Sequence, residues 1–244
     1  MLSSFFPRAS SAKLVSSAPV LALLIAGLFA TEAAGQSHSG VRYRVEQRHV
    51  EQLSDKGLDR LVPYSEAVAS ARRAELRARS AEREVKDRLD EAKTDAAIAN
   101  EDLDLARAMV RAARLTNDPA AVAEARTEEA LQLESRSLVD KRIRWLESQL
   151  QSERAAVALA VRVVWLRETE FELARAQRLW KEGARAAADY RLASFEDQTE
   201  RFRRGAERAG RSAARCTAKS AKLEQAYRQE LASLREGLEA TPGS

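Results

Sequence analysis

The sequence predicts an all-α fold: a long antiparallel three-helix coiled-coil rod or bundle. The composition is 45% hydrophobic and 32% charged but only 5% aromatic, with 9 glycines in 244 residues. Such a balance is typical of long helices and coiled coils. Apolar residues recur at heptad spacing through three long segments, and short Pro, Asp or Gly breaks separate them. Because the breaks are short, consecutive helices must run antiparallel.

The central segment, residues 121–182, carries apolar residues on two opposite sides. One stripe consists of Ile143, Leu146, Leu150, Val157, Ala160, Val164, Phe171 and Ala174. The other follows the register Leu131, Leu138, Trp145, Ser152, Leu159, Leu166, Leu173 and Trp180. The two stripes lie about 200° apart on a helix. A helix with two apolar sides needs two neighbours, so we expect the preceding and following segments to pack on either side of it.

The breaks between the segments set the expected boundaries. The three-helix unit covers residues 63–240, with helices at about 63–115, 119–182 and 184–238. Asp118 is expected to cap the central helix, with Pro119 at its first position, and Gly183 to end it. In the third helix Cys216 falls on the apolar stripe. We expect it to be a buried small residue, or alternatively to form an intermolecular disulfide, since the chain has no second cysteine. Residues 241–244 are expected to form a disordered tail.

The first 35 residues resemble a secretory signal peptide. Arg8 and Lys13 precede an apolar run over residues 19–30, and small residues follow it. This run is shorter than the roughly 20 residues that span a bilayer. We expect cleavage near Ala33 to Gly35 and a periplasmic or secreted protein; an uncleaved anchor and an organellar transit peptide are the alternatives. Residues 36–62 form a polar leader with a possible short helix around residues 43–53, either folded onto the rod or flexible.

A basic stripe is the first candidate site. Arginines follow a three-four spacing in the third helix, so their side chains share one face: Arg201, Arg204, Arg208, Arg211 and Arg215. Such a stripe is able to bind the phosphates of an anionic membrane surface. Nucleic acid is not expected, because the protein is predicted to be exported and the stripe lacks interleaved aromatic residues. The alternative is that these arginines pair with Glu or Asp of a neighbouring helix.

The second candidate site is the glycine turn after the central helix. The run from Leu179 through Gly183 and Ala184 to Asp189, Tyr190 and Ala193 resembles the hairpin tip of periplasmic adaptor (membrane fusion) proteins. The resemblance covers about 20 residues and implies partner contact through Arg175, Leu179, Gly183, Asp189 and Tyr190. In that family a Ser seven residues after the Leu also meets the outer-membrane channel; here position 186 is Ala.

No catalytic, metal or cofactor motif is recognisable. His38 and His49 have no partner at metal-ligand spacing, and acidic pairs follow helix-surface spacing. We therefore predict a non-enzymatic, exported coiled-coil interaction or scaffold protein of the bacterial cell envelope. It would bind protein partners, or itself, through its helical faces. A holdase-type periplasmic chaperone or an anionic-membrane binder is the alternative, and an adaptor-like component of an export or efflux assembly is the third hypothesis.

Overall fold

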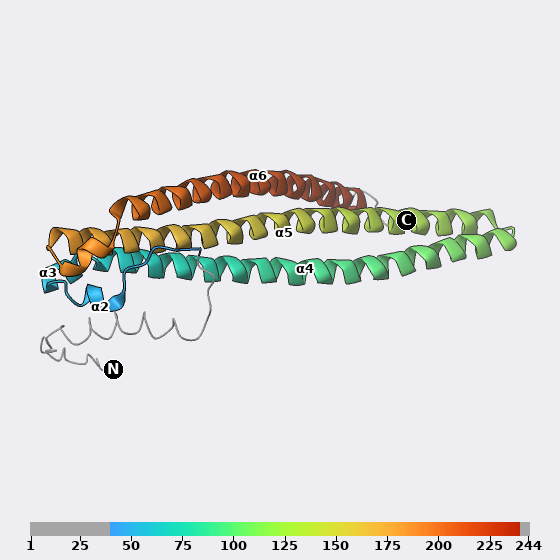
Figure 1. Ribbon diagram of the computed structural model, residues 1–244. Coiled ribbons are helices and arrows are strands. Elements are labelled where there is room, and N and C mark those ends of the chain that lie inside the picture. Colours follow the sequence, from blue (N-terminus) through green and yellow to red (C-terminus); the bar gives the residue numbers. More distant parts are fainter. Residues whose placement is uncertain (1–39, 240–244) are drawn as a thin grey trace, which may run out of the picture. The chain divides into compact units, whose positions relative to one another are not determined.

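The computed structural model describes residues 40–239, and within them every regular element is helical (Figure 1). Two short helices, α2 (Gln47–Val50) and α3 (Asp55–Asp59), precede three long ones. These are α4 (Val62–Leu115), α5 (Pro119–Lys181) and α6 (Leu192–Glu239). The predicted all-α bundle is confirmed. The expected signal segment 1–35 with its expected cleavage site, and the expected tail 241–244, lie outside the described residues.

Helices α4 and α5 form an antiparallel hairpin with a short turn. The Asp118 carboxylate accepts a hydrogen bond from the Ala120 amide at 2.9 Å, and Pro119 occupies the first turn of α5. The side of α4 that faces α5 is built mainly from small residues, with larger aliphatic ones between them. Its buried residues are Val68, Ala71, Val85, Leu89, Ala92, Ala96, Ala99, Leu103, Ala106 and Val110. Small side chains allow the two backbones to approach closely, as the heptad pattern predicts.

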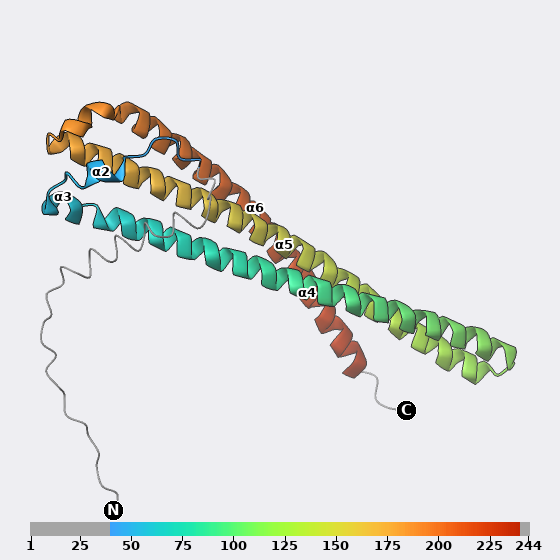
Figure 2. The same ribbon diagram turned by 60° about the horizontal axis from the view of Figure 1, so that its bottom comes forward.

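Helix α5 lies between α4 and α6, as the two views show (Figures 1 and 2). Leu146 and Leu150 pack against Val85, Leu89 and Ala92 of α4. On the other side the Trp145 ring stacks on Tyr227 of α6 with centroids 5.4 Å apart. The Trp165 ring meets Phe202 of α6 edge to face at 5.9 Å. The prediction of one neighbour on each apolar side of the central helix is confirmed.

The connection between α5 and α6 is longer than the sequence suggests. Gly183 ends α5 with φ +66°, in the left-handed region that favours glycine. The third helix, expected from residue 184, begins only at Leu192, because a 3₁₀ turn, η2 (Arg185–Asp189), intervenes. This turn buries Ala186 and Ala187 against the end of α5.

Two glycine substitutions are expected to have opposite effects on stability. An added Cβ at Gly183 would meet no atom within 4 Å, so Gly183→Ala costs only backbone strain at positive φ, about 1–2 kcal/mol. At Gly210, inside α6, the Cβ would lie 3.8 Å from Leu159 Cδ1, an ordinary contact. Gly210→Ala should therefore raise the free energy of unfolding by up to about 1 kcal/mol. Urea unfolding followed by circular dichroism measures both changes, and shifts of the same sign would contradict this account.

The leader folds onto the end of the bundle where α5 turns into α6. It has two short helices instead of the single one expected around residues 43–53. Between the two helices, the Ser54 hydroxyl accepts a hydrogen bond from the Gly57 amide at 3.1 Å and caps the start of α3. Four buried apolar residues of the leader join a cluster around Leu179 of α5: Val45, Val50, Leu53 and Leu61. This end of the structure therefore has a core of its own.

Candidate functional site

The five arginines of the basic stripe are all exposed on α6. Ala206 and Ala213, which are buried on the α5 side, lie two residues from Arg204, Arg208, Arg211 and Arg215. Two residues correspond to about 200° around a helix. The guanidinium groups therefore share the side of α6 that faces away from α5, and the sequence placed them on one face correctly.

The same face continues beyond the stripe. Lys219 and Lys222 are exposed and follow Arg215 at the spacings of four and three that relate the arginines. We call these seven residues the basic face: Arg201, Arg204, Arg208, Arg211, Arg215, Lys219 and Lys222. Residues 201–222 hold eight basic residues and one acidic residue, a net charge of +7 in a chain whose total is +4. The three-four spacing alone predicts that the two lysines share this face, but the sequence analysis considered only arginines and did not include them.

Few residues of the basic face are neutralised by carboxylates. Arg204 forms an ion pair with Glu200 of its own helix at 2.9 Å. The hydrogen bond from Arg204, together with the charges of Arg204 and Arg203, lowers the pKa of the Glu200 carboxyl. Within the described chain, the other six residues of the face form no ion pair. The interpretation that these arginines pair with a neighbouring helix therefore does not describe this face.

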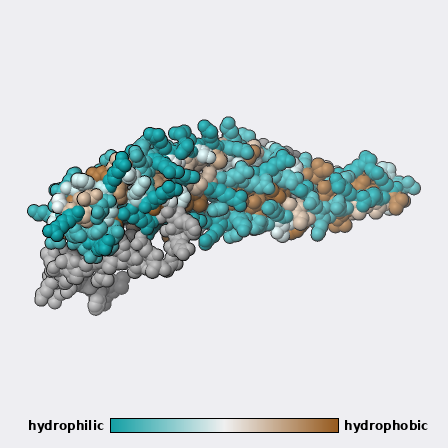
Figure 3. All heavy atoms as spheres, in the orientation of Figure 1, coloured by the Kyte–Doolittle hydropathy of each residue, from teal (hydrophilic) through white to brown (hydrophobic). Residues whose placement is uncertain are grey.

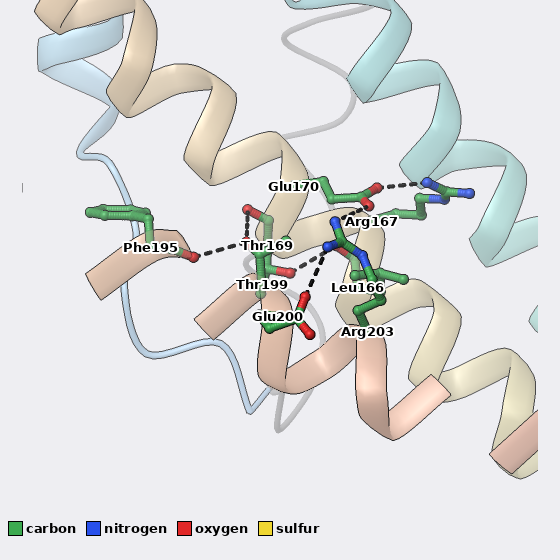
Figure 4. A network of polar contacts seen from close by, with 8 residues as sticks. All are labelled: Leu166, Arg167, Thr169, Glu170, Phe195, Thr199, Glu200 and Arg203. Atoms are coloured by element: carbon green, nitrogen blue, oxygen red, sulfur yellow. Dashed lines mark hydrogen bonds and ion pairs between the residues drawn. The ribbon is translucent and has the colours of Figure 1, made fainter. Parts of the chain in front are cut away.

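Arg203, which is close to the basic face but lies on a different side of α6, does form ion pairs. Its guanidinium bridges Glu200 at 2.9 Å and Glu170 of α5 at 3.9 Å (Figure 4). Beneath it, the buried Thr199 hydroxyl donates to the Phe195 carbonyl at 2.9 Å. The same hydroxyl also lies 3.4 Å from the Thr169 carbonyl of α5, and this contact and the Arg203–Glu170 pair join α6 to α5.

The seam between α4 and α5 differs from the basic face in its pairing. Cations of one helix meet acids of the other along its length, as in the pairs Arg72–Glu168, Arg142–Asp95 and Arg154–Glu82. Arg107 similarly approaches Glu129 near the far end of the hairpin. Charges at this seam compensate one another, whereas on the outside of α6 basic residues outnumber acidic ones.

The glycine turn does not present most of its candidate contact residues. Of the five, Gly183 and Asp189 are exposed, whereas Arg175, Leu179 and Tyr190 are buried. Leu179 has no exposed surface. The Arg175 guanidinium lies 4.1 Å from the Phe171 ring centre and donates to Glu172 Oε1 at 3.1 Å. In this structure these side chains pack within the protein and are not available to a partner.

The leader, residues 41–61, covers the buried side chains around the glycine turn. The Tyr190 hydroxyl accepts a hydrogen bond from the Glu46 amide at 3.0 Å and lies 2.6 Å from His49 Nδ1. Glu172 Oε2 accepts from the Val45 amide at 2.9 Å, and Glu182 Oε2 from the Ser54 amide at 2.8 Å. Side chains of α5 and of the α5–α6 connection thus satisfy leader backbone amides.

Exposed apolar side chains concentrate at the opposite end, around the α4–α5 turn. Among the described residues ten large hydrophobic or aromatic side chains are exposed, and six of them fall within residues 98–133. We call these six the distal surface: Ile98, Leu105, Met109, Leu115, Leu131 and Leu133. Figure 3 shows apolar side chains at this end among the hydrophilic ones that cover most of the molecule. Of the six, the sequence analysis named only Leu131, as part of a stripe that was expected to be covered by a neighbouring helix.

Other site types find no support in the described residues. No group of His, Cys, Asp and Glu there is arranged to hold a metal ion. None of the helices from residue 40 onward combines the length and apolarity needed to cross a bilayer. Cys216 is half-buried with a free thiol. No protein-family model, curated protein or solved structure matches the chain.

Proposed function

We propose that this chain is a non-enzymatic helical scaffold protein of the cell envelope that binds another polypeptide through the distal surface. One observation carries the proposal: six of the ten large apolar or aromatic side chains that are exposed among the described residues lie within residues 98–133, at one end of the bundle. Exposed apolar groups that gather in one region, instead of being scattered singly, are typical of interaction sites. Export rests on the signal-like first 35 residues.

The arrangement on α4 supports this function. Ile98, Leu105 and Met109 follow one another at spacings of seven and four residues, so they form a stripe along one side of the helix. Ala99 and Ala106 follow directly after Ile98 and Leu105, about 100° farther around the helix, and are buried. Ile98 is 53% exposed, Leu105 62% and Met109 50%. Such a stripe provides one half of a helix–helix or helix-in-groove interface, and the partner supplies the other half.

Site-specific photocrosslinking tests the proposal. A benzophenone amino acid at position 105 lies in the distal surface, and one at position 76 provides the matched control. Leu76 is also on α4 and is 68% exposed, but it lies outside the distal surface. We expect an adduct in the envelope fraction from position 105 and none from position 76. Replacing Ile98 and Met109 with Gln should abolish the adduct, because each loses most of its apolar contact area.

The mass of the adduct distinguishes the kinds of partner. One discrete band supports a dedicated protein partner, and a band at twice the mass of the chain supports self-association. A smear of many masses would support a holdase-type chaperone, which the same apolar surface favours because holdases bind many unfolded clients. Equal labelling from positions 105 and 76, or no adduct from either, would overturn the assignment of the distal surface.

A further inference from the structure

We infer that the basic face of α6 binds the phosphate groups of an anionic membrane surface, so that the bundle lies along the bilayer. This inference uses a different part of the molecule from the distal surface and does not depend on it. Seven exposed cations extend from Arg201 to Lys222, a distance of about 32 Å along the helix. Six of the seven form no ion pair with other described residues, so their charge is available to an external anion.

The shape of the face favours a membrane over other polyanions. The cations follow one side of a single helix, α6, which packs on α5. A planar layer of headgroups can meet such a line throughout, whereas the groove of a duplex winds away from a straight helix within about one turn. The one aromatic residue between positions 201 and 222, Phe202, packs against Trp165, so no ring is free to stack on bases.

The composition of the face also predicts how the protein binds. No large apolar side chain lies among the seven cations, so no residue of this face is suited to enter the acyl layer. Attachment is therefore peripheral, reversible and sensitive to salt. Each cation near an anionic bilayer increases partitioning about fivefold. Loss of three should reduce partitioning on the order of 100-fold.

A vesicle sedimentation experiment with the full chain tests this inference. Vesicles contain phosphatidylcholine alone or with 30% phosphatidylglycerol. The variant R208Q/R211Q/R215Q removes three cations that have no ion pair among the described residues. The control R73Q/R77Q/R83Q changes the net charge equally, because those arginines are exposed on α4 and are likewise without ion pairs there. Unchanged thermal unfolding of both variants shows that neither substitution disturbs the bundle.

Binding to the phosphatidylglycerol vesicles should fall about 100-fold for the α6 variant and much less for the control, and 0.5 M NaCl should abolish it. The phosphatidylcholine vesicles measure binding that does not depend on charge, including any from the N-terminal apolar run. Equal losses in the two variants would overturn the inference, since net charge alone would then be responsible. Tighter binding of a 30-base-pair DNA duplex through the same arginines would also overturn it, in favour of nucleic acid.

Discussion

Replacing Glu172 with Leu is expected to lower the free energy of unfolding by about 3–5 kcal/mol. The Glu172 side chain is buried in α5, where Oε1 accepts from Arg175 Nη1 at 3.1 Å and Oε2 from the Val45 amide at 2.9 Å. Arg175 is only 5% exposed. Removing the carboxylate removes one ion pair of the buried Arg175 guanidinium and the acceptor of a leader amide. Urea unfolding followed by circular dichroism measures the loss.

Two further variants identify the cause of the Glu172→Leu effect. Glu170→Gln on the same helix removes a carboxylate whose partners, Arg167 and Arg203, are about half exposed. It should cost less than about 1 kcal/mol. Adding Arg175→Met to Glu172→Leu should restore much of the stability, because the buried guanidinium is then removed together with the carboxylate. A Glu172→Leu effect as small as that of Glu170→Gln would contradict the buried ion pair.

The same substitution should release the leader. With the Val45 amide unpaired, residues 41–61 lose one of the bonds that hold them to α5, and trypsin should cleave at Arg42, Arg44 or Arg48 faster than in the unmodified chain. The bonds from Ser54 to Glu182 are at the other side of the leader and remain. Unchanged cleavage at these sites would mean that the leader does not depend on Glu172.

Leu146→Ala is expected to destabilise the protein by about 2–5 kcal/mol. Leu146 is 1% exposed and packs against Val85, Leu89 and Ala92 of α4. The small side chain of Ala92 cannot expand into the space that the leucine leaves, so the cavity persists. Urea unfolding measures the loss, and hydrogen exchange should show the backbone around Val85 and Leu89 becoming less protected.

Leu133→Ala is the matched control on the same helix. Leu133 is 51% exposed, so truncating it removes little buried surface and should change stability by less than about 1 kcal/mol. Similar losses from Leu146→Ala and Leu133→Ala would show that Leu146 is not part of the packed interface between α4 and α5.

The leader and the glycine turn show why some local features escaped the sequence analysis. Helical periodicity identifies long helices because many residues contribute to the pattern. The 3₁₀ turn after Gly183 and the two short leader helices depend on single contacts instead. The Ser54 hydroxyl begins α3, and Glu182 and Tyr190 accept leader amides from far along the chain. Pairing across more than a hundred residues leaves no local pattern in the sequence.

The sequence by itself determined the long helices, the capped turn at Asp118 and Pro119, the stop at Gly183 and the two neighbours of the central helix. Each follows from side-chain spacing or from the backbone preferences of Pro and Gly, which are local properties. Only the tertiary structure decided which stripe residues are covered. Leu146 and Leu131 both occupy heptad positions of α5, yet Leu146 is 1% exposed and Leu131 41%. Periodicity gives the direction of a side chain, but burial requires another chain segment beside it.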